Sequence, residues 1–253
     1  MKCAWYGAIG WLALAPMAAH ADDPQSLTLT RAQKVGDVVR HKIEVAAQAG
    51  GADATVVREV KLEVKEVKPS GEVTTVLTDL GGKVNAMGQD MDIPPSSPVT
   101  VVSDKLGRIL KYQRSTDDIT ITSVMAPEVE RLVAMAQDYV LPEKPVKAGD
   151  SWQYEVANPA VKDTKATIRA TFVGIEKLAE AEVRKIKQVV TAQAEASGEK
   201  MVAEIVFVTE PSSGRVLKAE GTMKGVPTQY GPMDLTWKAT IVKPEAEKSA
   251  PPK

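Results

Sequence analysis

Apolar and polar residues alternate with a period of two along most of this chain. Between residues 39 and 47 the apolar positions share one parity, as Val39, Ile43 and Val45. The opposite parity carries charge, as Arg40, Lys42 and Glu44. This period is typical of strands with one buried and one solvated face. The pattern therefore predicts a mainly β fold built of antiparallel strands.

Interruptions of the alternation predict where strands bend or end. Val67 falls on the wrong parity after Val60, Leu62 and Val64, which predicts a β-bulge near Glu66. Residues 73–80 read as the next strand, and the glycine- and proline-rich stretch 81–98 reads as a connection with one short strand at most. Gly107, between the alternating stretches 99–102 and 108–112, predicts a hairpin that needs a left-handed backbone.

One stretch has helical rather than strand spacing. Pro127 suits the first position of a helix, and Glu128 and Glu130 suit its positive end. The apolar residues that follow are spaced three and four apart, namely Val129, Leu132, Val133, Ala136 and Val140. The sequence therefore predicts one main α-helix over residues 127–140.

Two similar halves, about 30–114 and 146–242, are suggested by repeated local sequence. Gly36-Asp37 and Gly149-Asp150 each precede a strand. Near the end of each half stands a glycine-led strand, Gly107-Arg108-Ile109-Leu110-Lys111 in one and Gly214-Arg215-Val216-Leu217-Lys218 in the other. Repeats of this size indicate a duplicated unit. Similar hairpin chemistry arising by chance is the alternative, and the helix would join the halves.

The first 21 residues have the three parts of a secretory signal. Lys2 stands beside the amino terminus, an apolar run spans residues 8–18, and Ala19 and Ala21 provide a cleavage site. A run of this length is too short to span a membrane. We expect cleavage after Ala21, a β-rich domain over residues 22–242 in the periplasm or outside the cell, and a disordered tail over 243–253.

Export limits the chemistry that the chain can perform. It removes Cys3 and His20, and it leaves His41 as the one imidazole. No nucleotide-binding loop or zinc-protease motif occurs, and the formal net charge of −1 gives no nucleic-acid footprint. His41 lies on the apolar parity of its strand, so a structural role is favoured over a catalytic base. We expect no catalytic residues, no metal and no cofactor, and the patterns assign no residue to a binding site.

Weaker motifs have structural explanations that are favoured over chemical ones. Ser197-Gly198-Glu199-Lys200 has the spacing of a serine-lysine pair but falls in an expected turn. Met87 and Met91 have a Cu(I)-like spacing without a histidine. Asp90 and Asp92 lack the further oxygen ligands of a calcium loop. Trp152 and Trp237 lie on apolar strand parities, where core packing is favoured over the wall of a ligand cavity.

The order of elements carries a resemblance to known proteins. Leu141-Pro142-Glu143-Lys144-Pro145-Val146 leads into Lys147-Ala148-Gly149-Asp150-Ser151-Trp152 between the helix and further strands. In this order the chain resembles families of uncharacterised exported bacterial proteins and, more distantly, envelope proteins of the LolA, LppX and RseB type. The resemblance implies a curved antiparallel sheet or unclosed barrel over one or more helices.

Two functions follow from these expectations. One is a non-catalytic cell-envelope protein that binds an apolar or lipidic ligand in the concave face of its sheet. The other is an interaction or structural module whose sheet is filled by its own side chains and whose surface meets another envelope protein. A hydrolase ranks third, because no nucleophile, base or metal cluster is identifiable. A carrier needs a cavity of roughly 300 to 1,000 Å³ lined by apolar groups.

Overall fold

The computed structural model describes residues 26–49, 52–86, 88–115, 125–194, 198–229 and 231–242. The expected signal at 1–21 and tail at 243–253 lie outside the described residues. Within them the chain forms twelve strands and one α-helix. In chain order these are β1 (Val38–Ala49), β2 (Ala52–Val67), β3 (Val73–Ala86), β4 (Gln89–Ile93), β5 (Val99–Ser103), β6 (Ile109–Arg114), α1 (Pro127–Gln137), β7 (Ser151–Ala157), β8 (Lys165–Leu178), β9 (Ala181–Gln193), β10 (Lys200–Thr209), β11 (Val216–Thr228) and β12 (Gly231–Ile241).

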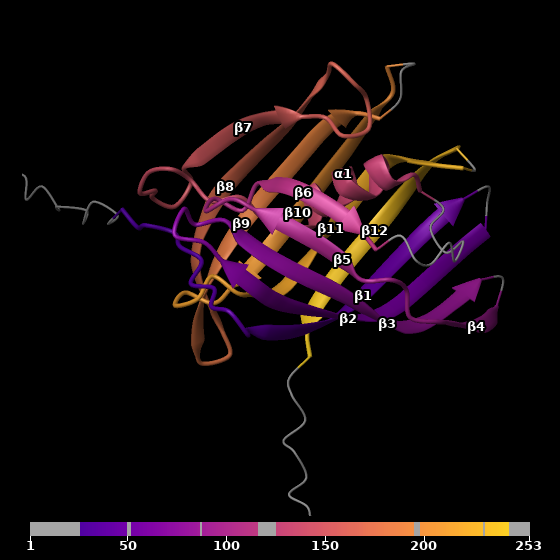
Figure 1. Ribbon diagram of the computed structural model, residues 1–253, viewed down its shortest axis with the longest axis horizontal. Coiled ribbons are helices and arrows are strands. Elements are labelled where there is room, and N and C mark those ends of the chain that lie inside the picture. The colour runs from indigo at the N-terminus through magenta and orange to yellow at the C-terminus, as the bar shows by residue number, and fades with distance from the viewer. Residues whose placement is uncertain are drawn as a thin grey trace, which may run out of the picture.

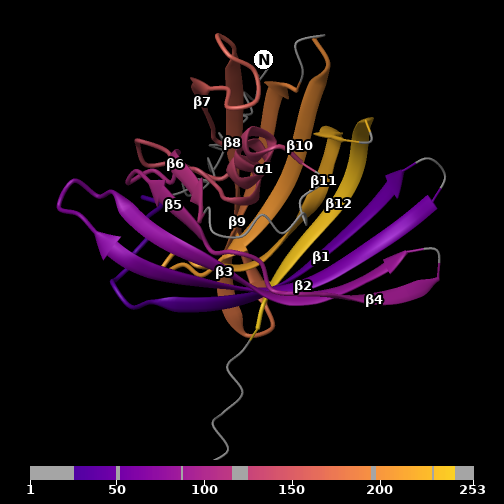
Figure 2. The same cartoon turned by 45° about the vertical axis from the view of Figure 1, so that its right-hand side comes forward.

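All twelve strands belong to one antiparallel sheet that does not close. Their order is β6-β5-β3-β2-β1-β12-β11-β10-β9-β8-β7, and β4 pairs with β3 beside this path. The sheet curves, and α1 lies on its concave side (Figures 1 and 2). The mainly β fold with one main helix, predicted from alternation, is confirmed. So is the curved, unclosed sheet that the resemblance implies.

The hydrophobic core lies between α1 and one part of the sheet. The helix packs against β9, β10 and β11. Leu132 of the helix, Phe207 of β10 and Met223 of β11 are fully buried there. At the other part, β1, β2 and β4 extend away from the helix (Figure 2). The core therefore fills only part of the concave face.

The helix ends at Gln137, three residues before the end expected from apolar spacing. Gln188 of β9 explains this end, because its side chain is 1% exposed and meets the backbone that follows the helix. Its amide nitrogen donates to the carbonyl oxygen of Asp138 (2.8 Å), and its oxygen accepts from the N–H of Val140 (3.0 Å). Val140 is buried as expected, but in extended backbone beyond the helix.

Strand β3 corrects the expectation that residues 81–98 form a connection. The strand continues through Gly81 and Gly82 to Ala86 and pairs with β4. Gly81 has a positive φ of 88°, and a Cβ on Gly82 would lie 2.0 Å from the carbonyl oxygen of Val57. Two glycines thus let the strand bulge and come close to β2 instead of ending. The bulge expected near Glu66 is present, between Val64 and Glu66.

The turns before β1 and β7 make the same hydrogen bonds. Asp37 N–H donates to the carbonyl oxygen of Lys34 (3.0 Å), and Asp150 N–H donates to that of Lys147 (3.0 Å). In each turn the aspartate carboxylate accepts from the backbone N–H of the lysine, at 2.8 Å. The equivalence of the halves 30–114 and 146–242 stays a prediction, and superposition of the two segments would test it.

Candidate functional site

One row of directly paired residues crosses eight strands on the concave face. Its helix-side members are Gln188 (β9), Ile205 (β10), Gly221 (β11) and Trp237 (β12). Beyond Trp237 the row continues through Val45 (β1), Val56 (β2), Val84 (β3) and Met91 (β4). The five residues from Trp237 to Met91 are named the concave row. Directly paired residues point to the same side of a sheet. Because Gln188 contacts the helix end, the whole row faces the side on which α1 lies.

Burial decreases along this row as it leaves the helix. Gln188 and Ile205 are 1% exposed, and Trp237 is 5% exposed. Val45, Val56 and Val84 are half-buried, and Met91 on the outermost strand is 51% exposed. From Trp237 to Met91 every member of the row is apolar, although the helix no longer covers it. The apolar side chains of the core thus continue, strand by strand, onto a surface that solvent can reach.

The rows on either side extend the apolar character. One neighbouring row joins Leu235, Ala47, Ala54 and Ala86, all half-buried. The other joins Ala239, Ile43, Arg58, Gly82 and Ile93. Together the half-buried and exposed apolar members form the concave apolar surface: Val45, Ala47, Ala54, Val56, Val84, Ala86, Met91, Ile93 and Leu235. Two of them, Val45 and Leu235, also pack against the core. Contiguous exposed apolar patches on soluble proteins mark binding surfaces.

Arg58 borders this surface and belongs to a charged network. Its guanidinium pairs with the carboxylate of Asp79, whose side chain is 6% exposed. Asp79 also accepts from the N–H of Gly81 (2.9 Å) and the hydroxyl of Ser96 (2.8 Å). A carboxylate buried to this degree needs such partners. Three donors from three segments therefore hold Asp79 beneath the apolar surface.

A second ion pair links the helix to the first strands. Arg114 of β6 donates to Glu130 of α1 at 2.8 Å, and Glu130 is buried. Burial alone would lower the pKa of Arg114, but the hydrogen bond and charge of Glu130 outweigh it and raise that pKa. Glu130 was expected to act on the helix dipole, and in the structure it also fastens α1 to β6.

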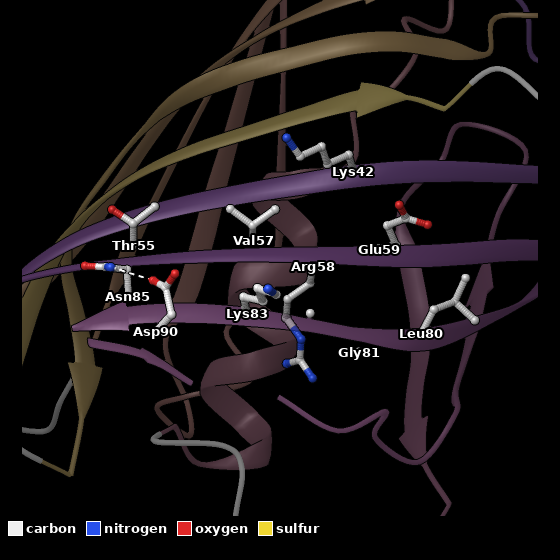
Figure 3. A pocket seen from close by; sticks show the side chains of 11 residues that line it. Lys42, Thr55, Val57, Arg58, Glu59, Leu80, Gly81, Lys83, Asn85 and Asp90 are labelled. Atoms are coloured by element: carbon white, nitrogen blue, oxygen red, sulfur yellow. Dashed lines mark hydrogen bonds between the residues drawn. The ribbon is translucent and has the colours of Figure 1, made fainter. Parts of the chain in front are cut away.

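A hollow among the described residues lies on the opposite, outer face. It has a volume of about 530 Å³ and is lined by residues of β1 to β4 (Figure 3). Thr55 and Asn85 face it, and they alternate with Val56 and Val84 of the concave row. Its lining mixes the cations Lys42, Arg58 and Lys83 with acidic Glu59 and Asp90, so Arg58 reaches this hollow as well as bordering the concave face. The volume suits a small ligand, but the lining is not the apolar wall that a carrier needs.

His41 lies inside the sheet rather than at an open site. It is 9% exposed, and its Nε2 lies 3.0 Å from the carbonyl oxygen of Val216. A carbonyl oxygen accepts only, so Nε2 carries the proton of the neutral ring. Burial lowers the pKa of His41 below its usual 6.5. The favoured structural role agrees with this placement.

The other sequence candidates do not converge on a site. Met91 lies on the concave row, whereas Met87 and Ser197 are outside the described residues. Asp90 and Asp92 alternate with Met91 in β4, and Asp90 accepts from Asn85 Nδ2 at 2.6 Å. Among the described residues no three His, Cys, Asp or Glu side chains group as metal ligands.

The described residues contain no helix with the length and apolar character needed to span a membrane.

The two tryptophans lie where the sequence favoured them, whereas the Arg58–Asp79 pair was not foreseen. Trp237 is core, as favoured, and Trp152 is half-buried with its Nε1 donating to Val140 at 3.2 Å. Arg58 and Asp79 were not singled out. One signal for Arg58 was available in the sequence. Its charge lies on the same parity as Val56 and Val60, where the alternation predicts an apolar residue.

Comparisons with known proteins find similarity at the level of solved structures. No family model matches the chain, and no curated protein matches it. Lipovitellin, from a study of lipid-protein interactions, is similar over 86% of this chain and 26% of its own, with 11% identity and a TM-score of 0.46. This chain thus spans about a quarter of the lipovitellin chain.

Two bacterial structures are also similar. The hypothetical lipoprotein YmcC from Escherichia coli has 13% identity and a TM-score of 0.29, over 88% of this chain and 92% of its own. A domain from Vibrio parahaemolyticus, described as an outer membrane lipoprotein-sorting protein domain, has 10% identity and a TM-score of 0.24, over 86% and 90%. Both similarities extend over most of each chain.

Proposed function

We propose that this chain is a non-catalytic cell-envelope protein that binds the acyl chain of a lipid on its concave apolar surface. The observation that carries the proposal is the concave row, which continues from the buried core to Met91 without losing its apolar character. Val45, Val56 and Val84 lie beyond the strands against which α1 packs. An apolar ligand would remove these side chains from water, and that burial favours binding.

The dimensions of the row suit an acyl chain. From Trp237 to Met91 the row crosses four strand spacings, which is roughly 19 Å at about 4.8 Å per spacing. One leaflet of a bilayer core is about 15 Å thick, half of the roughly 30 Å total. A single extended chain could therefore lie across β12, β1, β2, β3 and β4. The curvature of the sheet would let it touch all five strands (Figure 2).

Absence of catalysis and location in the envelope are part of the same proposal. His41 is the one imidazole outside residues 1–21, and it is buried and bonded to a backbone carbonyl. A general base must reach the proton that it abstracts. The envelope location rests on the export signal expected at residues 1–21, which would deliver the chain to a compartment rich in lipid.

The proposal is tested by native mass spectrometry of protein purified from its own envelope. We expect a co-purified lipid on the wild-type chain. Val84→Asp places a charge in the middle of the concave row and should reduce lipid occupancy at least fivefold. Thr55→Asp is the matched control, because Thr55 is exposed, faces the opposite side and should leave occupancy unchanged. Circular dichroism of both variants should match the wild type, since Val84 is only half-buried.

Two outcomes would contradict the proposal. One is a wild-type chain that is always empty, even after incubation with extracted envelope lipids. The other is equal occupancy in Val84→Asp and wild type. Capture of a defined protein partner by the empty chain, lost in Val84→Asp, would favour the interaction module instead.

A further inference from the structure

Among the described residues of the concave row and of the two rows beside it, Arg58 is the one that carries a charge. It pairs across the strands with Ile43 of β1 and Gly82 of β3. Because Gly82 has no side chain, β3 places nothing over Arg58 at that position. Val56 of the concave row is two residues away on the same strand and the same face. A cation thus borders an apolar surface directly.

Part of the Arg58 guanidinium lacks a partner. Nη2 pairs with Asp79 and lies 3.5 Å from the carbonyl oxygen of Pro94. Nε is buried, and no described residue accepts a hydrogen bond from it. The side chain as a whole is 25% exposed. The Nε atoms of Arg31, Arg131 and Arg184 are buried and unpartnered in the same way, so the position of Arg58 beside the apolar surface is what singles it out.

Asp79 has other donors besides Arg58. Gly81 and Ser96 both donate to its carboxylate, and the positive charge of Arg114 acts on it as well. Arginine carries five donors in a planar fork, so Asp79 does not saturate it. The remaining donors match an oxygen-rich anion, with which arginine forms short, charge-assisted bonds.

A second unpartnered donor lies on the other side of β1. Trp237 Nε1 is buried and has no acceptor among the described residues. Trp237 pairs with Val45, and Arg58 pairs with Ile43, so the two donors flank the same two residues of β1. Both stand where the helix-covered core gives way to the uncovered surface. The polar end of a ligand at this position could accept hydrogen bonds from Arg58 and Trp237, beside the start of the concave row.

We propose that the lipid bound by this chain has an anionic head group, a carboxylate or a phosphate, which accepts hydrogen bonds from Arg58. Its acyl chain then lies along the concave row toward Met91. The inference rests on the proposed function, because it assigns a head-group position to the same ligand. It also fixes the direction in which that ligand lies on the sheet.

Three amphiphiles with the same palmitoyl chain test the head-group preference. They are palmitate, palmitoyl-lysophosphatidylglycerol and the uncharged monopalmitoylglycerol, each titrated below its aggregation concentration against a dansylated fatty acid displaced from the protein. We expect the wild type to bind at least one of the two anionic amphiphiles at least tenfold more tightly than monopalmitoylglycerol. Preference for palmitate identifies a carboxylate ligand, and preference for the lysophospholipid identifies a phosphate ligand.

Variants separate Arg58 from the rest of the surface. Arg58→Gln should bring the anionic amphiphiles to within about twofold of monopalmitoylglycerol, whose own affinity stays unchanged. Because this variant leaves Asp79 with one partner fewer, Arg58→Gln combined with Asp79→Asn removes both charges and should give the same result in a stable protein. Lys42→Gln is the matched control, since Lys42 lies on the neighbouring strand and its replacement removes a cation from the outer hollow, which Arg58 also lines (Figure 3).

The outcomes distinguish this inference from the proposed function. Equal wild-type affinity for all three amphiphiles, or a preference that survives in the double variant, would overturn the head-group inference and leave acyl-chain binding intact. Loss of the preference in Lys42→Gln would also overturn it, by moving the anion site to the outer face. Failure of all three amphiphiles to displace the probe would overturn both.

Discussion

At the scale of single residues, His41 links the stability of the fold to pH. Burial depresses its pKa in the folded protein below the usual 6.5, so the folded state favours the neutral ring. The unfolded chain binds the proton more readily between these two values. The contribution of His41 is therefore fully present above about pH 6.5. It is lost progressively as the pH falls toward the depressed value.

Replacing His41 with Gln should remove this dependence and leave the fold intact. The glutamine amide can donate to the Val216 carbonyl as the imidazole does. We expect similar free energies of unfolding for both proteins at pH 7.5. Between pH 6.5 and pH 5.5 the wild type should lose up to about 1.4 kcal/mol more than the variant, from one proton per molecule. Urea titrations at both values measure the difference, and parallel losses in the two proteins would contradict the assignment.

Gln188 shows why some residues escape sequence reasoning. It stands on the apolar parity of β9 between Ile186 and Val190, so alternation calls for an apolar side chain there. Its amide instead serves backbone groups some 50 positions earlier in the chain. Arg58 and Asp79 likewise occupy apolar parities for reasons of tertiary contact. Such residues become interpretable only when the partner segment is known.

At the scale of elements, the β10–β11 hairpin is fixed by a glycine in close contact. Gly214 has a φ of 70°, and a Cβ on it would lie 2.4 Å from the carbonyl oxygen of Thr30 and 2.9 Å from the hydroxyl of Tyr139. That hydroxyl donates to the carbonyl oxygen of Gly214 at 2.6 Å. The hairpin, the segment before β1 and the segment after α1 therefore meet at this glycine.

Gly214→Ala should destabilise the protein more than Gly36→Ala does. Both glycines have left-handed backbone, so each substitution costs roughly 1 to 2 kcal/mol of strain. An alanine methyl group at position 36 would have no neighbour within 4 Å, whereas one at Gly214 would meet two fixed atoms. We expect Gly214→Ala to cost roughly a further 1 to 3 kcal/mol from overpacking. Thermal unfolding of the two variants side by side measures this, and equal losses would contradict the contact.

Strands and turns were predictable from the sequence where residues close together in the chain determine them. The strands around Val39–Ala47 and the hairpin at Gly107, whose φ is 87°, follow from alternation and turn chemistry. The path of β3 through Gly81 and Gly82 did not, because glycines mark a strand end and a bulge alike until the approach to Val57 is seen. The concave row could not be located either, since its members come from five strands whose register the sequence does not state.

At the scale of the whole molecule, one sheet supports two different environments. Over β9, β10 and β11 the concave face is covered by α1 and fully buried. Over β1 to β4 the same face carries half-buried Val45, Val56 and Val84 and exposed Met91. These strands extend away from α1 (Figure 2). The Arg114–Glu130 pair joins β6 to α1, and the Arg58–Asp79 pair joins β2 to β3. A single continuous sheet thus joins a buried core to a partly exposed apolar surface.

The most direct test of this account is photo-crosslinking with a palmitate analogue that carries a diazirine in its acyl chain. After irradiation, digestion and mass spectrometry, the account predicts adducts on the concave row, at Val45, Val56, Val84 and Met91. Their yield should fall when unlabelled palmitate competes. Adducts confined to the outer-face residues Thr55, Val57 and Asn85, adducts confined to β7 and β8, or no competable adduct at all would contradict it.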